Sequence, residues 1–326
     1  MGDIVFAIVA IVIGIAASYG LFGLLNFLLS LLPARIYQKN SWLAFLTPAA
    51  VLVILVLVMP LFQTVIWSFK DKGVKEWVGF KNYVNIFTDV HFLAILLNNF
   101  LWVLVVPAVT VAIGTIVATL TNQVGPTLEK IFKSLIFMPM SISFVAASTI
   151  WAYFYAYTPP GRPVIGLLNA IVGWFGIGSQ PWITIDQGRL NSFLLMAVLV
   201  WLQVGYAMVV ISAAIKAVPE ETIEAAQLDG ANAWQLFAGI VLPQIWGTVM
   251  SVFITVLILV MKIFDIILAM TRGNFTTGVL ALEWYNRFFV DSNLGSASAV
   301  VTVLVILIAP LMWLQINTAR QQEILR

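Results

Sequence analysis

Cysteine is absent from this 326-residue chain. Its absence excludes disulfide bridges and thiolate metal sites. It also means that cysteine usage cannot indicate whether the protein lies in an oxidising or a reducing compartment. Histidine occurs once, as His91 at the edge of an apolar segment, where a boundary residue is a simpler explanation than a catalytic base. The chain also has no Gly-rich G-x4-G-K-[ST] loop, so it cannot hydrolyse ATP by itself. We therefore expect no catalytic residue, no metal site and no cofactor held by this chain.

Charged residues are scarce as well, at 9% of the chain with a formal net charge of +2. The lysines and arginines form no cluster that would indicate a nucleic-acid partner. Hydrophobic residues make up 62% of the chain, and the mean hydropathy is +1.03. A soluble domain could not bury that much apolar surface, so the solvent of this protein is largely lipid.

Seven apolar segments are long enough to cross a bilayer. The first is too long for a signal peptide and has no basic region before it. The sequence therefore predicts an all-α polytopic membrane protein with spans at 4–32, 42–68, 92–120, 135–157, 191–215, 245–270 and 297–316.

Charge near the first span favours one orientation. Asp3 precedes this span, whereas Arg35 and Lys39 follow it, which favours an N-terminus outside and a first loop inside. Seven spans then place the C-terminus, with Arg320 and Arg326, in the cytoplasm. Basic residues elsewhere are no fewer in the outside segments, so this rule alone does not decide the topology. The largest outside segment, 158–190, is rich in Gly, Pro and Trp, which predicts ordered turns and short re-entrant or interfacial helices.

The loop at 216–243 is the one long amphipathic run between two spans. Pro219 can start a helix, and acidic residues then fill its first turns, where the helix dipole favours them. Gly230 can end that helix in the left-handed conformation. Asn232 and Gln235 then have the spacing of a capping box for a second short helix. Trp234, Phe237 and Leu242 would give that helix an apolar stripe, and Pro243 marks the approach to the next span.

The pattern E-A-A-x-x-x-G-x9-I-x-L-P in this loop resembles the cytoplasmic coupling loop of permease subunits of bacterial ATP-binding-cassette importers. An isolated Ala-Ala pair occurs in many helical hairpins, but here every position of the pattern is met. The resemblance assigns ATPase coupling to Glu224, Ala225, Ala226, Asp229, Gly230, Ile240, Leu242 and Pro243.

A second run, K-x-F-D-x4-M-T-x-G, begins at Lys262 and is similar to sugar importer permeases of the maltose type. Those permeases often continue with G-G-P, whereas this chain has Arg272-Gly273-Asn274-Phe275. That departure resembles an α-glucoside branch, as does the run 295–299. Lys262 and Asp265 are three residues apart, so we expect them on one face of the sixth span. They are either polar groups of the substrate path or subunit interface, or a structural ion pair.

The resemblance also implies a sugar cavity near mid-membrane, lined by aromatic and polar side chains. Gln203 and Tyr206 lie three apart in an apolar span and are the first candidates, followed by Asn99 and Trp151. Amides and hydroxyls pair with sugar hydroxyls, and aromatic rings stack on pyranose faces. Helix packing is the alternative explanation for each of these polar residues. An interfacial belt is a better explanation than a sugar platform for Trp151, Tyr153, Tyr155 and Tyr157.

The family further implies a six-helix core at 42–326, preceded by one N-terminal helix and a cytoplasmic linker at 1–41. Its expected partners are a second permease subunit, two copies of a cytoplasmic ATPase that binds ATP and Mg, an extracytoplasmic solute-binding protein, a sugar and the lipid of the bacterial inner membrane. A secondary transporter or a membrane assembly scaffold is the alternative. A secondary transporter would need an ion-binding carboxylate within the spans, and only Asp265 is available.

Overall fold

The computed structural model describes residues 2–31 and 34–324. Residue 32, where we expected the first span to end, and Arg326 lie outside the described residues. The described chain forms two compact units, residues 1–67 and 68–326. The predicted boundary after residue 41 follows from the family resemblance and stays a prediction.

The first unit is a pair of helices. It contains α1 (Gly2–Ser30), α2 (Ala34–Val53), a π-helical turn η1 (Ile54–Val58) and α3 (Met59–Trp67). The last three run on as one helix that ends at Trp67, so the second predicted span at 42–68 is helical except at Ser68 and begins earlier than expected. The rings of Phe22 and Phe45 pack 4.8 Å apart between α1 and α2.

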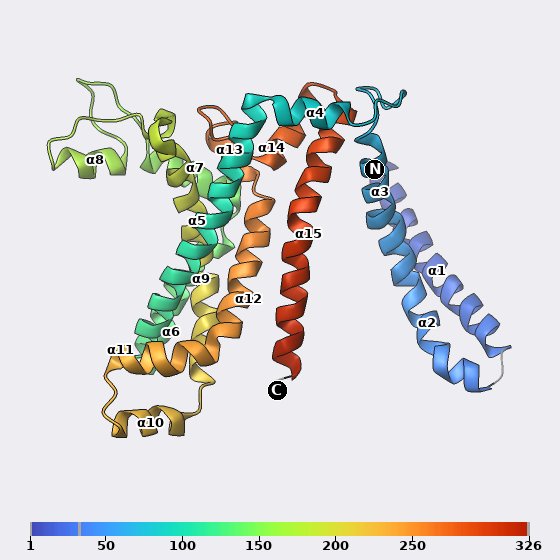
Figure 1. Cartoon of the computed structure of the whole chain (residues 1–326), viewed down its shortest axis with the longest axis horizontal. Helices are drawn as coiled ribbons and strands as arrows, with labels where there is room; N and C mark the ends of the chain where they lie inside the picture. Colours follow the sequence, from blue (N-terminus) through green and yellow to red (C-terminus); the bar gives the residue numbers. More distant parts are fainter. Residues whose placement is uncertain (1, 32–33, 325–326) are drawn as a thin grey trace. The chain divides into compact units, whose positions relative to one another are not determined.

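The second unit is built around α9 (Leu190–Lys216), which α5 (Val90–Thr121) contacts along its length (Figure 1). Helix α12 (Leu242–Met261) packs against α5 and against α15 (Leu294–Ile324). Large apolar side chains such as Trp102, Leu199 and Met208 are fully buried where α5 meets α9. Helices suit this environment because they satisfy all their backbone hydrogen bonds internally.

Between α5 and α9, one predicted span is broken. Helix α6 (Pro126–Phe137) continues through η2 (Met138–Ser141) and then turns by 103° into α7 (Phe144–Phe154). Pro139 lacks an N–H, and Ser143 caps the new helix by accepting from Ala146 N at 3.2 Å. Six helices of the described residues are long enough to span a membrane, and the number is seven if this bent pair counts as one span. The predicted seven spans are reached only with that count, and the fourth is not one straight helix over 135–157.

Short helices gather at one end of the second unit (Figure 1). They are α4 (Lys81–Thr88), α8 (Leu167–Gly173), η3 (Trp182–Thr184), η4 (Gln187–Arg189), α13 (Asp265–Met270), α14 (Leu280–Tyr285) and the π-turn η6 (Asn286–Val290). The opposite end carries α10 (Glu220–Leu228), α11 (Ala233–Leu236), the π-turn η5 (Phe237–Val241) and the end of α15.

Two side chains organise the end with the short helices. Buried Asn169 donates to the carbonyls of Ala156 and Gln180 and accepts from Gln180 N and Trp182 Nε1, which uses its whole hydrogen-bonding capacity. Arg287 bonds Glu283 Oε1 at 2.5 Å and joins α14 to the starts of α5 and α15. The predicted ordered turns in 158–190 are therefore present.

Candidate functional site

Helix α10 begins and ends where the sequence predicts. Pro219 is its N-cap, and Glu220 and Glu221 occupy its first turn. Gly230 follows the helix with φ +83°, in the left-handed region. The N–H of Ala231 donates to Ala226 O and that of Gly230 donates to Gln227 O, both at 3.0 Å. These two hydrogen bonds are the pattern of a Schellman motif. The local prediction for this helix is confirmed.

The second helix of the loop starts as predicted but does not stop. Asn232 and Gln235 form the capping box, with both bonds at 2.9 Å. The chain then remains helical from Ala233 to Met261, so Pro243 does not separate a short helix from the span. An α-helix would require the Pro243 N–H to bond Gly239 O. The π-turn η5 directly before α12 opens the hydrogen-bond ladder there and accommodates the missing donor.

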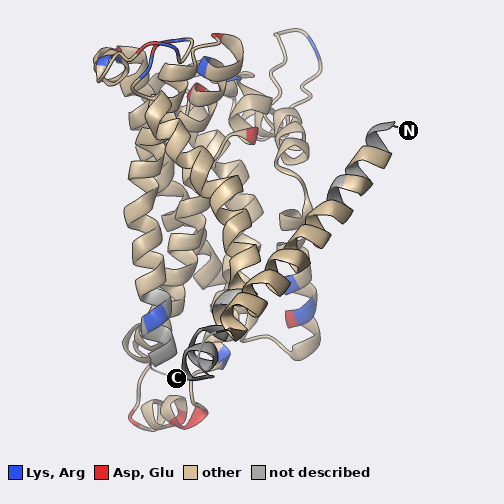
Figure 2. Ribbon diagram, turned by 90° about the vertical axis from the view of Figure 1, so that its right-hand side faces the viewer, with Lys and Arg blue, Asp and Glu red and all other residues tan. Residues whose placement is uncertain are grey.

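The loop presents an exposed surface made of acidic and large apolar groups. Ile223 and Ala226 face the body of the protein, whereas Glu224 and Ala225 are exposed. Leu228 is 89% exposed and Trp234 is 73% exposed. The ring centroid of Trp234 lies 6.2 Å from that of Phe237, and both residues line one apolar cavity with Leu242, so the predicted stripe is present. Figure 2 shows acidic residues gathered on α10. Such a surface, with acidic and large apolar side chains exposed on the same loop, is suited to docking another protein.

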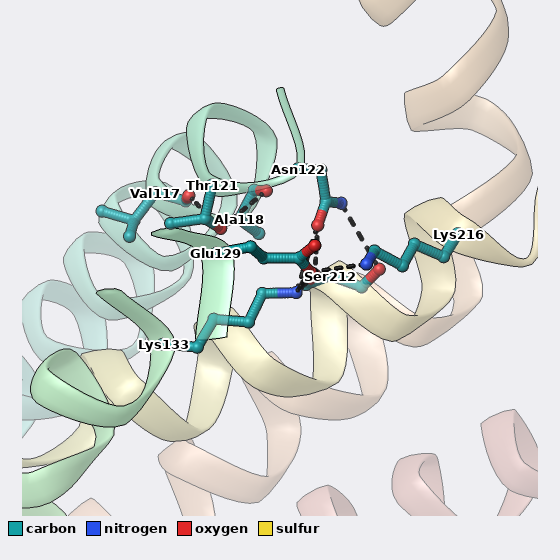
Figure 3. Close-up of polar contacts among 8 residues, drawn as sticks. All are labelled: Val117, Ala118, Thr121, Asn122, Glu129, Lys133, Ser212 and Lys216. Carbon is teal, nitrogen blue, oxygen red and sulfur yellow. Dashed lines mark hydrogen bonds and ion pairs between the residues drawn. The ribbon is translucent and has the colours of Figure 1, made fainter. Parts of the chain in front are cut away.

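A polar cluster that the sequence did not reveal lies close to this loop (Figure 3). Glu129 of α6 forms ion pairs with Lys133 of the same helix and with Lys216, the last residue of α9. Asn122 and Ser212 complete the cluster through hydrogen bonds. Glu129 and Lys216 are 87 residues apart, so no local pattern could have revealed the pair. Only the approach of α6 to the end of α9 brings them together.

The two main candidates for the sugar path lie in the middle of α9. Gln203 is 5% exposed and Tyr206 is partly buried. The helix is continuous between them, so they share a face as expected. Within the described ranges, no hydrogen bond is recorded for either side chain. An amide side chain with no protein partner among the described residues is a candidate for binding a polar ligand.

The side-chain amides of Asn98 and Asn99 each form one hydrogen bond to a backbone atom, so neither amide is wholly available to a substrate. Asn98 Nδ2 donates to Gly278 O, and Asn99 Oδ1 accepts from Leu280 N, each at 2.8 Å. These bonds tie α5 to the start of α14. The Nδ2 atom of Asn99 remains buried without a partner, and Asn99 is one of the residues that line a cavity of about 240 Å³ between α5, α12 and α15.

Trp151 belongs to an aromatic cluster of α7 and α9. Its ring centroid lies 5.8 Å from that of Trp201 and 5.0 Å from that of Phe154. Tyr155 is only 3% exposed, and its hydroxyl donates to Leu194 O at 3.0 Å, so it is a core residue and no part of an interfacial belt. Tyr153 and Tyr157 are exposed, as a belt would require.

Lys262 and Asp265 do not share a helix face, so that prediction is wrong. Helix α12 ends at Met261, and Phe264 leaves helical geometry with φ −143° before α13 starts at Asp265. Lys262 is exposed, and the structure records no ion pair between these two residues within its described part. Breaking the helix lets each charge be accommodated separately, which a continuous apolar span would not allow.

Residues 110–321 match the family model of the binding-protein-dependent transport system inner membrane component. The matched region contains the coupling-loop pattern and four of the spans. This chain belongs to that family.

Two relatives of this chain are named as permease proteins. This chain is 45% identical over 285 residues to the alpha-glucoside transport system permease protein AglF of Rhizobium meliloti, a match that covers 87% of this chain and 83% of AglF. It is 43% identical over 282 residues to the osmoprotective compounds uptake permease protein GgtC of Synechocystis, covering 86% of this chain and all of GgtC. A bacterial ABC transporter involved in alginate import has the same fold, with a TM-score of 0.74 at 20% identity over 88% of this chain and 99% of that one.

The family places the transport component in the inner membrane and makes it a transport subunit that works with a binding protein. Of the residues expected to act, those of the coupling loop lie at one end of the second unit, where Glu224 and Ala225 are exposed and Ala226 is buried. The residues expected in the sugar path are dispersed: Gln203 and Tyr206 lie in mid-helix, Trp151 packs against α9, and Lys262 and Asp265 flank a helix break.

Proposed function

We propose that this chain is the permease subunit of an ATP-driven importer of α-glucosides. It would form half of the translocation pathway with a second permease, receive its substrate from an extracytoplasmic binding protein, and couple through α10 to a cytoplasmic ATPase that binds ATP and Mg. The identity of 45% with AglF over most of both chains supports the substrate class. The exposed coupling surface of α10 supports the ATPase partner.

Uptake into proteoliposomes tests the substrate class. The complex would be reconstituted with its second permease, its ATPase and its binding protein, with ATP supplied on the ATPase side. We expect uptake of labelled α-linked glucosides such as maltose or sucrose, and none of the β-galactoside lactose. GgtC is named as an uptake permease for osmoprotective compounds, so a solute of that class is the second candidate substrate. Uptake of that solute in the absence of α-glucoside uptake would replace the proposed substrate.

Orientation has a direct test because the chain contains no cysteine. We propose that α10 and the C-terminus face the cytoplasm. Leu228→Cys and Trp174→Cys each introduce one thiol at a site that is 89% or 84% exposed, respectively, at opposite ends of the second unit. In intact cells stripped of the outer membrane, a membrane-impermeant maleimide should label only the Trp174→Cys protein. Permeabilisation should add the Leu228→Cys label. The reverse pattern would invert the topology.

Gln203→Leu is expected to reduce α-glucoside uptake about two- to tenfold, because one hydrogen bond to a neutral ligand contributes about 0.5–1.5 kcal/mol. Complex assembly should be unchanged, since no protein partner of the amide is recorded among the described residues. Thr149→Val is the control, because the Thr149 hydroxyl bonds Val145 O within its own helix. Initial uptake rates and co-purification are measured together. Uptake equal to the control would assign Gln203 to helix packing.

A further inference from the structure

Glu129 connects two helices that are distant in the sequence. Its Oε1 atom lies 2.5 Å from Lys133 Nζ, one turn further along α6, and 2.5 Å from Lys216 Nζ at the end of α9. One carboxylate oxygen therefore lies between two ammonium groups (Figure 3). The pairing crosses from α6 to α9, so it fixes the distance between the two helices at this end of the second unit.

Lys133 extends the contact to α5. Besides Glu129, its ammonium donates to Asn122 Oδ1 at 3.1 Å and to Ser212 Oγ. Ser212 in turn donates to Asn122 Oδ1 at 2.6 Å. All three donors of the Lys133 ammonium thus have a protein acceptor. The C-cap of α5, the first turns of α6 and the last turns of α9 are joined in one polar network.

This network is less exposed to water than an ordinary surface ion pair. The side chains of Glu129 and Lys133 are 14% and 21% exposed, whereas that of Lys216 is 52% exposed. An isolated exposed pair stabilises a protein little, because water and salt screen it. Here the carboxylate and one ammonium are largely withdrawn from water and hold each other in place through several bonds. Removing Glu129 would leave Lys133 partly buried without its charge partner.

The position of the network points to a role in coupling. Lys216 is the last residue of α9, and only 217–219 separate it from α10. Helix α10 is connected to the spans at two ends, through 217–219 to α9 and through α11 to α12. A movement of α10 would be transmitted directly to α9 through 217–219. It would be transmitted to the start of α6 only if the ends of α6 and α9 move together. Helix α6 then leads through the 103° bend to α7 and Trp151.

We infer that Glu129 is a positioning residue that makes α6 follow the end of α9 when α10 moves. It acts through Lys216 and Lys133 and touches neither substrate nor nucleotide. This inference rests on the proposed coupling role of α10. It is independent of which solute is carried, because the network lies at the end of the unit opposite to the short helices.

Charge exchange tests the inference in the complete importer. Glu129→Gln is expected to lower ATP-driven uptake on the order of tenfold, within the usual range of a coupling free energy. The double variant E129K/K216E again places one carboxylate between two lysines, at 129 and 133, and should recover most of the uptake. Lys130→Met is the matched control, since no ion pair of Lys130 is recorded in the described part of the chain. It should transport like the wild type.

A cross-link provides the second measurement. In Glu129→Cys/Lys216→Cys the two thiols are the only ones in this chain, and uptake should be as low as in Glu129→Gln. A short bifunctional thiol reagent then restores the connection covalently, and uptake should rise again. Wild-type uptake by Glu129→Gln, or a charge exchange and a cross-link that both leave uptake low in a fully assembled complex, would overturn the inference. If the wild-type complex carries no α-glucoside, only the substrate proposal fails, and the series is repeated with the solute it does carry.

Discussion

Gly230→Val is expected to abolish transport while the protein remains folded in the membrane. Gly230 has φ +83°, and a side chain on an L residue in this region costs about 1–2 kcal/mol, more when it is β-branched. No atom lies within 4 Å of where its Cβ would be, so the effect is one of backbone conformation and not of crowding. To escape the strain, α10 must lose its Schellman bonds and change its direction relative to α11. The ATPase would then meet an altered docking surface.

Two matched variants isolate this cause. Gly125 also has open space where a Cβ would lie, but its φ is −61°, so Gly125→Val should transport normally. Gly230→Asn should retain most activity, because asparagine tolerates the left-handed region. ATPase co-purification and ATP-driven uptake are measured for all three. Wild-type association and uptake by Gly230→Val would show that the turn is not needed for coupling.

Gly205→Val is expected to prevent stable folding of the second unit. A Cβ at Gly205 would lie 2.5 Å from Ile136 O and 2.6 Å from Phe137 Cα, which are backbone atoms of α6. Backbone cannot rotate away as a side chain can, so α9 would have to separate from α6. Overpacking of a buried site costs about 1–3 kcal/mol, and contact with backbone places this variant at or above the upper limit. Close helix approach at small residues is what holds such spans together in lipid.

The yield of monodisperse protein after detergent extraction measures this effect. We expect Gly205→Val to be lost or aggregated, and Gly205→Ala to be reduced, since the Cβ alone already clashes. Gly173→Ala is the control, because no atom lies within 4 Å of its added Cβ. A Gly205→Val protein with normal yield and thermal stability would mean that α6 and α9 can separate at little cost, which would also weaken the case for a rigid connection through Glu129.

The sequence by itself determined the features whose causes are local. Spans are recognisable because a bilayer demands about 20 apolar residues in a row. The coupling loop was predictable residue by residue, because Pro219, Gly230 and the Asn232–Gln235 box each act within one helical turn. The same locality explains why the loop pattern alone was enough to indicate the family.

Tertiary structure decided what depends on residues far apart in the chain. The sixth span stops at Met261 and a separate helix, α13, begins at Asp265, although the apolar sequence continues past that point without a stop signal. Asn98 finds its partner 180 residues away, and Glu129 finds Lys216 after 87. Packing also brings Gly205 of α9 against the backbone of α6 at Ile136 and Phe137. Spacing along the chain encodes none of these contacts, because each exists only once the helices have packed.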